Sequence, residues 1–76
     1  MQREEMETEI RKRREATLFV PFVIELTSGE LVEVDDPDAI GFGGGAAGFI
    51  NAEGEPIDFD CFEIVRISDV SAAATA

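Results

Sequence analysis

The residues of this chain that could carry chemistry are mostly carboxylates. Asp35-Asp36-Pro37-Asp38 groups three of them around a proline, and Asp58 and Asp60 lie two residues apart. Oxygen ligands suit a hard cation, and paired carboxylates can act as general acid and base. Aspartates at turns, however, commonly bond their own backbone, and nothing marks Asp58 and Asp60 as part of a cleft. We therefore predict no metal, no cofactor and no catalytic residue, and keep a candidate interaction surface at Asp35, Asp36 and Asp38.

Nucleophiles and soft metal ligands are scarce. The chain has one cysteine, Cys61, and no histidine. No disulfide can form within the chain, the usual zinc ligand sets are missing, and no imidazole can activate the thiol. Cys61 is therefore expected to be a small buried residue.

The basic residues form one run, Arg11-Lys12-Arg13-Arg14, which could contact phosphates. The run also suits the end of a helix, where the helix dipole favours cations, or an arm that forms salt bridges with an acidic body. We regard its four residues as candidate interaction residues and expect the solvated or salt-bridging role.

Charge is distributed very unevenly along the chain. Residues 1–16 hold equal numbers of acids and bases, whereas residues 17–76 hold twelve acids and a single base, Arg66, and so carry the whole net charge of −11. Such a surface repels nucleic acid and anionic membranes and suits a basic protein partner. The same charge could serve solubility alone.

The glycine run contains a formal dinucleotide-binding fingerprint, since Gly43, Gly45 and Gly48 have the G-x-G-x-x-G spacing. That motif works only when it opens a helix whose N-terminus holds the pyrophosphate. Here the next residues run directly into Gly54 and Pro56, which leaves no room for the helix. A flexible hairpin loop is predicted instead.

A helix is predicted over residues 3–16, with glutamates at its start and the basic run at its end. Met6 and Ile10 give it a thin apolar stripe. A helix of this length is marginal in isolation, so it must dock on the rest of the chain or on a neighbouring subunit.

The central feature of the remaining chain is a hairpin over residues 22–34, which turns at Thr27-Ser28-Gly29-Glu30. Further short strands are predicted near residues 39–42, 49–51, 57–60 and 64–67, with a one-turn helix at Cys61-Phe62-Glu63. Alternating apolar residues predict a core of Phe22, Ile24, Leu26, Val32, Val34, Ile40, Phe49, Ile57, Phe59, Ile64 and Ile67.

This order of elements resembles SH3-like and Sm-like small barrels. Leu26-Thr27-Ser28-Gly29 is similar to the Leu-x-x-Gly of the Sm-like pattern, and Asp38 could stand for its aspartate. The loop that carries base-contacting residues in Sm-like RNA binders corresponds here to Phe59-Asp60-Cys61-Phe62-Glu63, which is acidic and apolar. The resemblance therefore implies the architecture and not the RNA site.

A second resemblance, over about residues 19–67, is to a group of short uncharacterised bacterial proteins found for example in planctomycetes. The matching residues are Pro21-Phe22, Leu26 with Gly29, Pro37, and Asp60-Cys61-Phe62-Glu63-Ile64-Val65. These motifs are structural, so the resemblance implies no activity.

The predicted fold is mostly β: a small five-stranded antiparallel Sm-like or SH3-like barrel at residues 18–68, an N-terminal α-helix at 1–17 and a disordered tail at 69–76. A split helix-plus-sheet fold is the alternative. No signal peptide or membrane-spanning run is evident, so a cytoplasmic location is expected. Because so short a chain buries little surface, we also expect self-association.

Three functions remain open. The first is a non-enzymatic acidic module that binds a protein partner or serves as an oligomeric scaffold. The second is an Sm-like oligomer that binds RNA through Arg11, Lys12, Arg13 and Arg14. The third, and weakest, is a small hydrolase that uses clustered carboxylates, with or without a metal.

Overall fold

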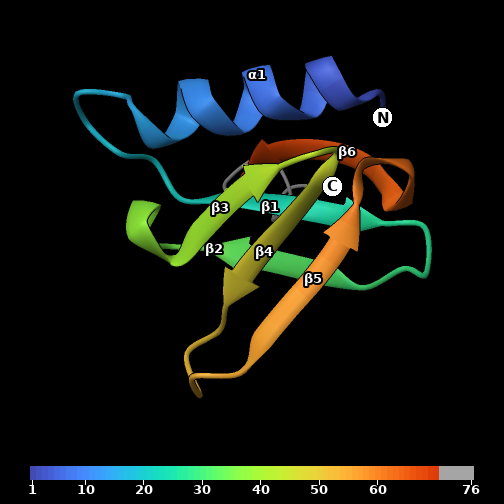
Figure 1. Ribbon diagram of the computed structural model, residues 1–76. Helices are drawn as coiled ribbons and strands as arrows, with labels where there is room; N and C mark the ends of the chain where they lie inside the picture. Colours follow the sequence, from blue (N-terminus) through green and yellow to red (C-terminus); the bar gives the residue numbers. More distant parts are fainter. Residues whose placement is uncertain (71–76) are drawn as a thin grey trace.

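The computed structural model describes residues 1–70, which form one α-helix, six strands and two short 3₁₀ helices (Figure 1). In chain order these are α1 (Arg3–Arg14), β1 (Phe22–Leu26), β2 (Leu31–Val34), η1 (Pro37–Ala39), β3 (Ile40–Gly43), β4 (Ala46–Ile50), β5 (Pro56–Asp60), η2 (Cys61–Glu63) and β6 (Ile64–Asp69). The chain is therefore mostly β with an N-terminal helix, as predicted.

The strands form two three-stranded antiparallel sheets, in the orders β2-β1-β6 and β3-β4-β5. The prediction of a closed barrel is thus wrong, and the six strands of residues 1–70 correspond to the six segments predicted along the chain and not to the five strands expected of the barrel. Two 3₁₀ helices explain the difference, because η1 separates β2 from β3 and η2 separates β5 from β6. Each sharp turn moves the chain from one sheet to the other, and no described strand pairs in both.

The hairpin predicted at the centre of the chain is present. Ile24 lies opposite Val32 in the β1–β2 register, and the Leu26 N–H donates to the Glu30 carbonyl at 2.9 Å. Gly29 has a φ of 90°, which an L side chain rarely adopts. The predicted hairpin and its glycine-dependent turn are therefore confirmed.

The glycine run is a tight turn and not the flexible loop that was predicted. Gly44 and Gly45 have φ values of 61° and 87°, and the strands pair directly on either side, from Gly43 opposite Ala46 onward. Two consecutive positive φ values are what a two-residue hairpin turn requires. The run is followed by strand β4, which agrees with the rejection of the dinucleotide fingerprint.

The buried core lies between the two sheets and beneath α1. It contains the predicted residues except Ile57 and Ile67, which are only partly buried against it. It also contains Ala47, Cys61 and, from the helix, Met6 and Ile10, both with no exposed surface. The burial predicted for Cys61 is confirmed.

The sequence left open whether the helix docks on the rest of its own chain or on a neighbouring subunit. In the structure it docks on its own chain. Figure 1 shows α1 lying across one side of the sheets, above β3 and β6, and it contacts β3, η1 and η2. Its end at Arg14 is two residues earlier than predicted. The tail predicted from residue 69 lies outside the described residues except for Asp69, which ends β6, and Val70.

Candidate interaction surface

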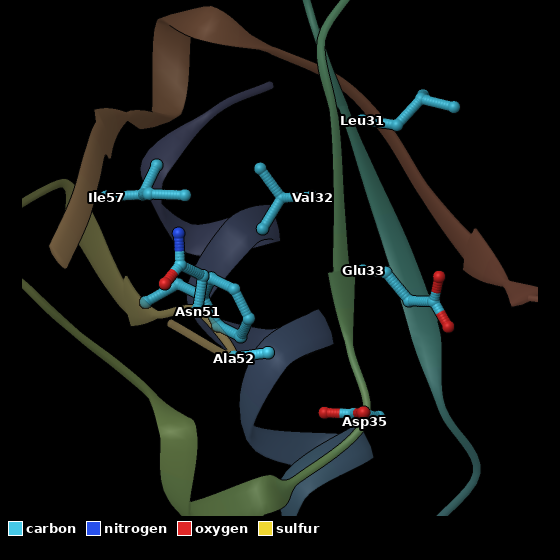
Figure 2. Close-up of a pocket in the computed structure, with 8 residues that line it drawn as sticks. Leu31, Val32, Glu33, Asp35, Asn51, Ala52 and Ile57 are labelled. Atoms are coloured by element: carbon cyan, nitrogen blue, oxygen red, sulfur yellow. The ribbon is translucent and has the colours of Figure 1, made fainter. Parts of the chain in front are cut away.

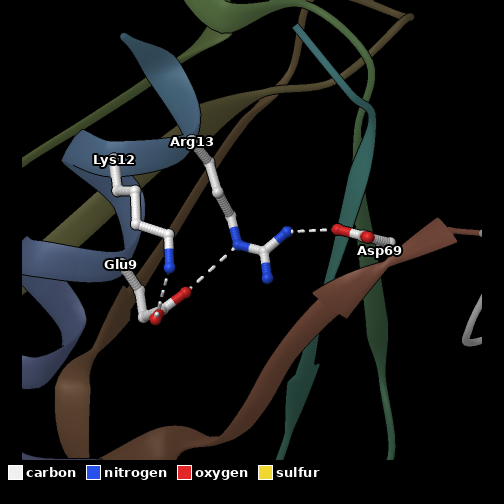
Figure 3. A network of polar contacts seen from close by, with 4 residues as sticks. All are labelled: Glu9, Lys12, Arg13 and Asp69. Atoms are coloured by element: carbon white, nitrogen blue, oxygen red, sulfur yellow. Dashed lines mark hydrogen bonds and ion pairs between the residues drawn. The ribbon is translucent and has the colours of Figure 1, made fainter. Parts of the chain in front are cut away.

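Arg13 connects α1 to the last strand. Its guanidinium contacts the Glu9 carboxylate at 3.2 Å and the Asp69 carboxylate of β6 at 2.6 Å (Figure 3). It also lies 5.5 Å from the centre of the Phe22 ring. The side chain is only 18% exposed. Arg13 therefore belongs to the interface between the helix and the sheets.

Two other residues of the basic run make similar contacts. Arg14 Nε donates to the Pro37 carbonyl of η1 at 3.0 Å, and the Arg11 guanidinium lies 5.3 Å from the centre of the Phe42 ring. Lys12 differs: its side chain is 70% exposed and its contact is with Glu9 of the same helix, at 3.7 Å. Within residues 1–70, only Arg13 of the four basic residues forms a salt bridge with the sheets, so the run combines the two roles expected from the sequence, a salt-bridging arm at Arg13 and a solvated helix end at Lys12.

We expect Arg13→Gln to lower the free energy of unfolding by about 1–2 kcal/mol, since it removes a partly buried ion pair and a cation–π contact. Urea denaturation at low salt measures the loss. Lys12→Gln is the matched control, because the exposed lysine should contribute less than about 0.5 kcal/mol. Equal losses for the two variants would contradict the role of Arg13.

Asp35, Asp36 and Asp38 lie around η1 and are exposed. The Asp36 carboxylate accepts the Asp38 N–H at 2.9 Å and caps η1, the bond expected of an aspartate at a turn. In residues 1–70 no group of three or more cysteines or carboxylates is placed to hold a metal ion. The hydrogen bond from Arg14 Nε to the Pro37 carbonyl places these aspartates next to the basic end of α1.

The other carboxylate pair lies on an open surface. Asp58 and Asp60 are both exposed on the outer face of β5. The Asp58 carboxylate leans over Gly48, so that a Cβ added to that glycine would lie 2.9 Å from its Oδ1. This arrangement offers no enclosed site for acid–base chemistry.

A groove of about 310 Å³ lies between β2 and the turn that joins β4 to β5 (Figure 2). We call it the β2 groove. Its lining combines apolar side chains with polar residues from both sides: Leu31, Val32, Glu33, Asp35, Phe49, Asn51, Ala52 and Ile57. Figure 2 shows Val32 and Ile57 directed into the groove, whereas the Leu31 and Glu33 side chains point away from it. The main chain of Leu31 and Glu33 therefore borders the groove.

Asn51 was not identified as a functional residue from the sequence. Its Oδ1 accepts two backbone N–H groups of the following turn, from Glu53 at 3.0 Å and from Glu55 at 2.9 Å. These bonds determine which end of the amide is oxygen, so its NH₂ group is the end presented to the groove, between Val32 and Ile57 (Figure 2). The signal in the sequence was an asparagine three residues before a glycine, which is typical of any turn.

Most carboxylates on the strands, turns and 3₁₀ helices that follow residue 16 form no ion pair within the described residues. Glu25 pairs with Arg66 at 2.8 Å and Asp69 pairs with Arg13, but the other ten acids of residues 17–70 form no ion pair. One group lies along β2 and η1, and a second lies on the β4–β5 turn, β5 and η2. The two groups comprise Glu30, Glu33, Asp35, Asp36 and Asp38, and Glu53, Glu55, Asp58, Asp60 and Glu63.

An apolar surface lies beside the edge strand β6. Phe62 of η2 is 82% exposed, and Val65 of β6 is about half exposed. Within the described residues β6 pairs with no strand other than β1, although the N-terminal amine of Met1 donates to the Ile64 carbonyl at 3.0 Å at the start of the strand. Exposed apolar residues beside an unpaired strand are typical of a site of association.

The comparisons with known proteins add no relative: no family model, curated protein or solved structure matches this chain. Within residues 1–70, no helix has both the length and the apolar character needed to cross a membrane.

Proposed function

We propose that the protein is a non-enzymatic acidic module that binds a basic protein partner. The observation that carries this proposal is the set of ten carboxylates without ion pairs on the strands, turns and 3₁₀ helices of residues 17–70. Like charges gathered on so small a surface repel one another in the free protein, and a cationic partner relieves that repulsion. Complementary charge also accelerates association and excludes partners of the wrong sign.

The alternative of RNA binding through the basic run receives less support. Arg13 is largely buried, Arg14 bonds a backbone carbonyl of η1, and Arg11 lies over Phe42. A phosphate would have to compete with these contacts and approach a chain with a net charge of −11. The hydrolase alternative lacks a sheltered pair of carboxylates among the described residues.

Self-association and the finer architecture are part of the same proposal. The order of a helix, a hairpin and a one-turn helix before the last strand supports a relationship to Sm-like or SH3-like proteins, and with it membership of the planctomycete-type group. Beyond Ile64, whose carbonyl bonds the Met1 amine, the β6 edge has no strand partner within residues 1–70, and together with exposed Phe62 and Val65 it supports pairing with a second copy. A cytoplasmic oligomeric scaffold would use this edge and keep the acidic surface for the partner.

Fluorescence anisotropy with labelled ligands tests the proposed function. We expect a lysine- and arginine-rich peptide to bind at low salt and to weaken strongly between ~50 and ~300 mM salt, because the Debye length shortens over that range. A uridine-rich RNA and an acidic peptide should not bind. Tighter binding of the RNA, or no binding of any basic peptide, would refute the proposal. Native mass spectrometry of the wild type and of Phe62→Ser tests self-association separately.

A further inference from the structure

We infer that the β2 groove binds an extended basic peptide, which adds to the sheet as a fourth strand beside β2. This inference rests on the proposed function and makes it specific: it names where the partner binds and in which conformation. Three independent features of the groove support it, namely the unpaired backbone of β2, the apolar floor with one oriented amide, and the carboxylates on both sides.

The backbone of β2 has an unused edge that borders the groove. The Leu26 N–H bonds the Glu30 carbonyl, and hydrogen-bonded positions alternate along an antiparallel pair. Val32 and Val34 therefore bond to β1, while the N–H and C=O groups of Leu31 and Glu33 point away from it. Among residues 1–70, β2 pairs with no strand other than β1. These groups are free to pair with an incoming strand.

The floor and the opposite wall suit one apolar side chain and one backbone carbonyl. Val32 and Ile57 point into the groove and Phe49 contributes to its lining. Val32 and Phe49 are only 3% and 6% exposed, so a valine or isoleucine of the peptide would chiefly cover the partly exposed Ile57 side chain above them. The Asn51 NH₂ group has no hydrogen-bond acceptor within the described residues, and its orientation is set by the two bonds to Oδ1. It can donate to a carbonyl of the added strand.

The charge around the groove determines which peptide it suits. Glu33 and Asp35 lie on the β2 side, and Glu53 and Glu55 follow Asn51 on the other. No basic residue lines the groove. An extended peptide alternates its side chains, so one that alternates lysine with valine directs the apolar set inward and the cations toward these carboxylates. A second copy that paired through its own β2 would bring like charges together, which disfavours that occupant.

The probe for the test is a labelled seven-residue peptide of alternating lysine and valine, and its backbone N-methylated analogue is the control. Binding should slow hydrogen exchange of the Leu31 and Glu33 amides by about tenfold or more, because both become bonded. The Val32 and Val34 amides, already bonded to β1, should change little. N-methylation along one edge should weaken binding by about tenfold, because it removes the N–H donors without changing the charge.

Matched variants distinguish the groove from the acidic surface in general. Glu33→Gln with Asp35→Asn should weaken binding of the peptide by about fivefold to tenfold, because both charges flank the groove. Asp58→Asn with Asp60→Asn removes the same charge from the outer face of β5 and should weaken it less than about twofold.

Each result has a defined meaning. If the peptide binds but the Leu31 and Glu33 amides stay unprotected, or the two double variants weaken it equally, the groove is not the site, although the proposed function stands. If those two amides are protected in the free protein in a concentration-dependent manner, a second copy occupies the groove and the inference is wrong. If no basic peptide binds at low salt, both the inference and the proposed function are wrong.

Discussion

Replacing Phe22 by alanine is expected to lower the free energy of unfolding by about 3–5 kcal/mol, the usual cost of removing a buried aromatic ring. Phe22 is fully buried at the start of β1, where its ring meets Phe19 edge-on and lies beneath the Arg13 guanidinium. The substitution therefore leaves a cavity and also removes the contact between the ring and α1. In a domain of this size such a loss approaches the whole stability.

Phe62→Ala is the matched control for Phe22→Ala at a protein concentration at which the chain is monomeric, because it deletes the same ring from a position that is 82% exposed. Its effect should remain within about 0.5 kcal/mol. Urea denaturation followed by circular dichroism measures both variants, and Phe22→Leu provides a milder change if the alanine variant does not fold. Comparable losses at Phe22 and Phe62 would show that the core does not lie where the structure places it.

Replacing Ile10 by alanine is expected to cost about 2–5 kcal/mol, although Ile10 lies on a helix that would be marginal alone. Ile10 and Met6 are fully buried and belong to the same core cluster as Ile24 and Ile64. Because the helix shares the core, its loss should be coupled to the unfolding of the sheets. A single transition, seen by helical and by β-sheet signals alike, is the expected behaviour.

Leu18→Ala is the control for Ile10→Ala, since Leu18 follows the helix but is 83% exposed. It should change the free energy of unfolding by less than about 0.5 kcal/mol. A result in which Ile10→Ala abolishes helical signal at low denaturant while the sheets remain folded would contradict the shared core. Native mass spectrometry of both variants would show whether either change affects assembly.

Most elements of this chain and the turn at Gly29 could be predicted from its sequence because their causes are local, whereas the tight turn at Gly44 and Gly45 was mistaken for a flexible loop. Alternation of apolar residues located β1 and β2, Gly29 marked the turn between them, and the acid-to-base gradient marked the helix. Most of the core followed from the same alternation. Asp36 was expected to bond its own backbone, and it does so two residues away.

The candidate site could be predicted only in part. The excess of acids on residues 17–76 was evident, and so was the possibility that the basic run forms salt bridges. The β2 groove was not predicted, because it depends on β2 lying opposite the β4–β5 turn. The role of Asn51 was also missed. The two hydrogen bonds to its Oδ1 orient the NH₂ group, but that group faces a groove only because Ile57 and Val32 lie beside it in the folded chain.

The sequence by itself determined where strands, helix and tight turns form, because φ preferences and side-chain alternation act within a few residues. Only the tertiary structure decided that the strands separate into two sheets and that α1 docks on its own chain. It also brought Arg13 into an ion pair with Asp69, which lies 56 residues further along the chain. Contacts between residues so distant in sequence depend on how whole elements pack, and one strand's pattern does not encode which of its edges remains unpaired.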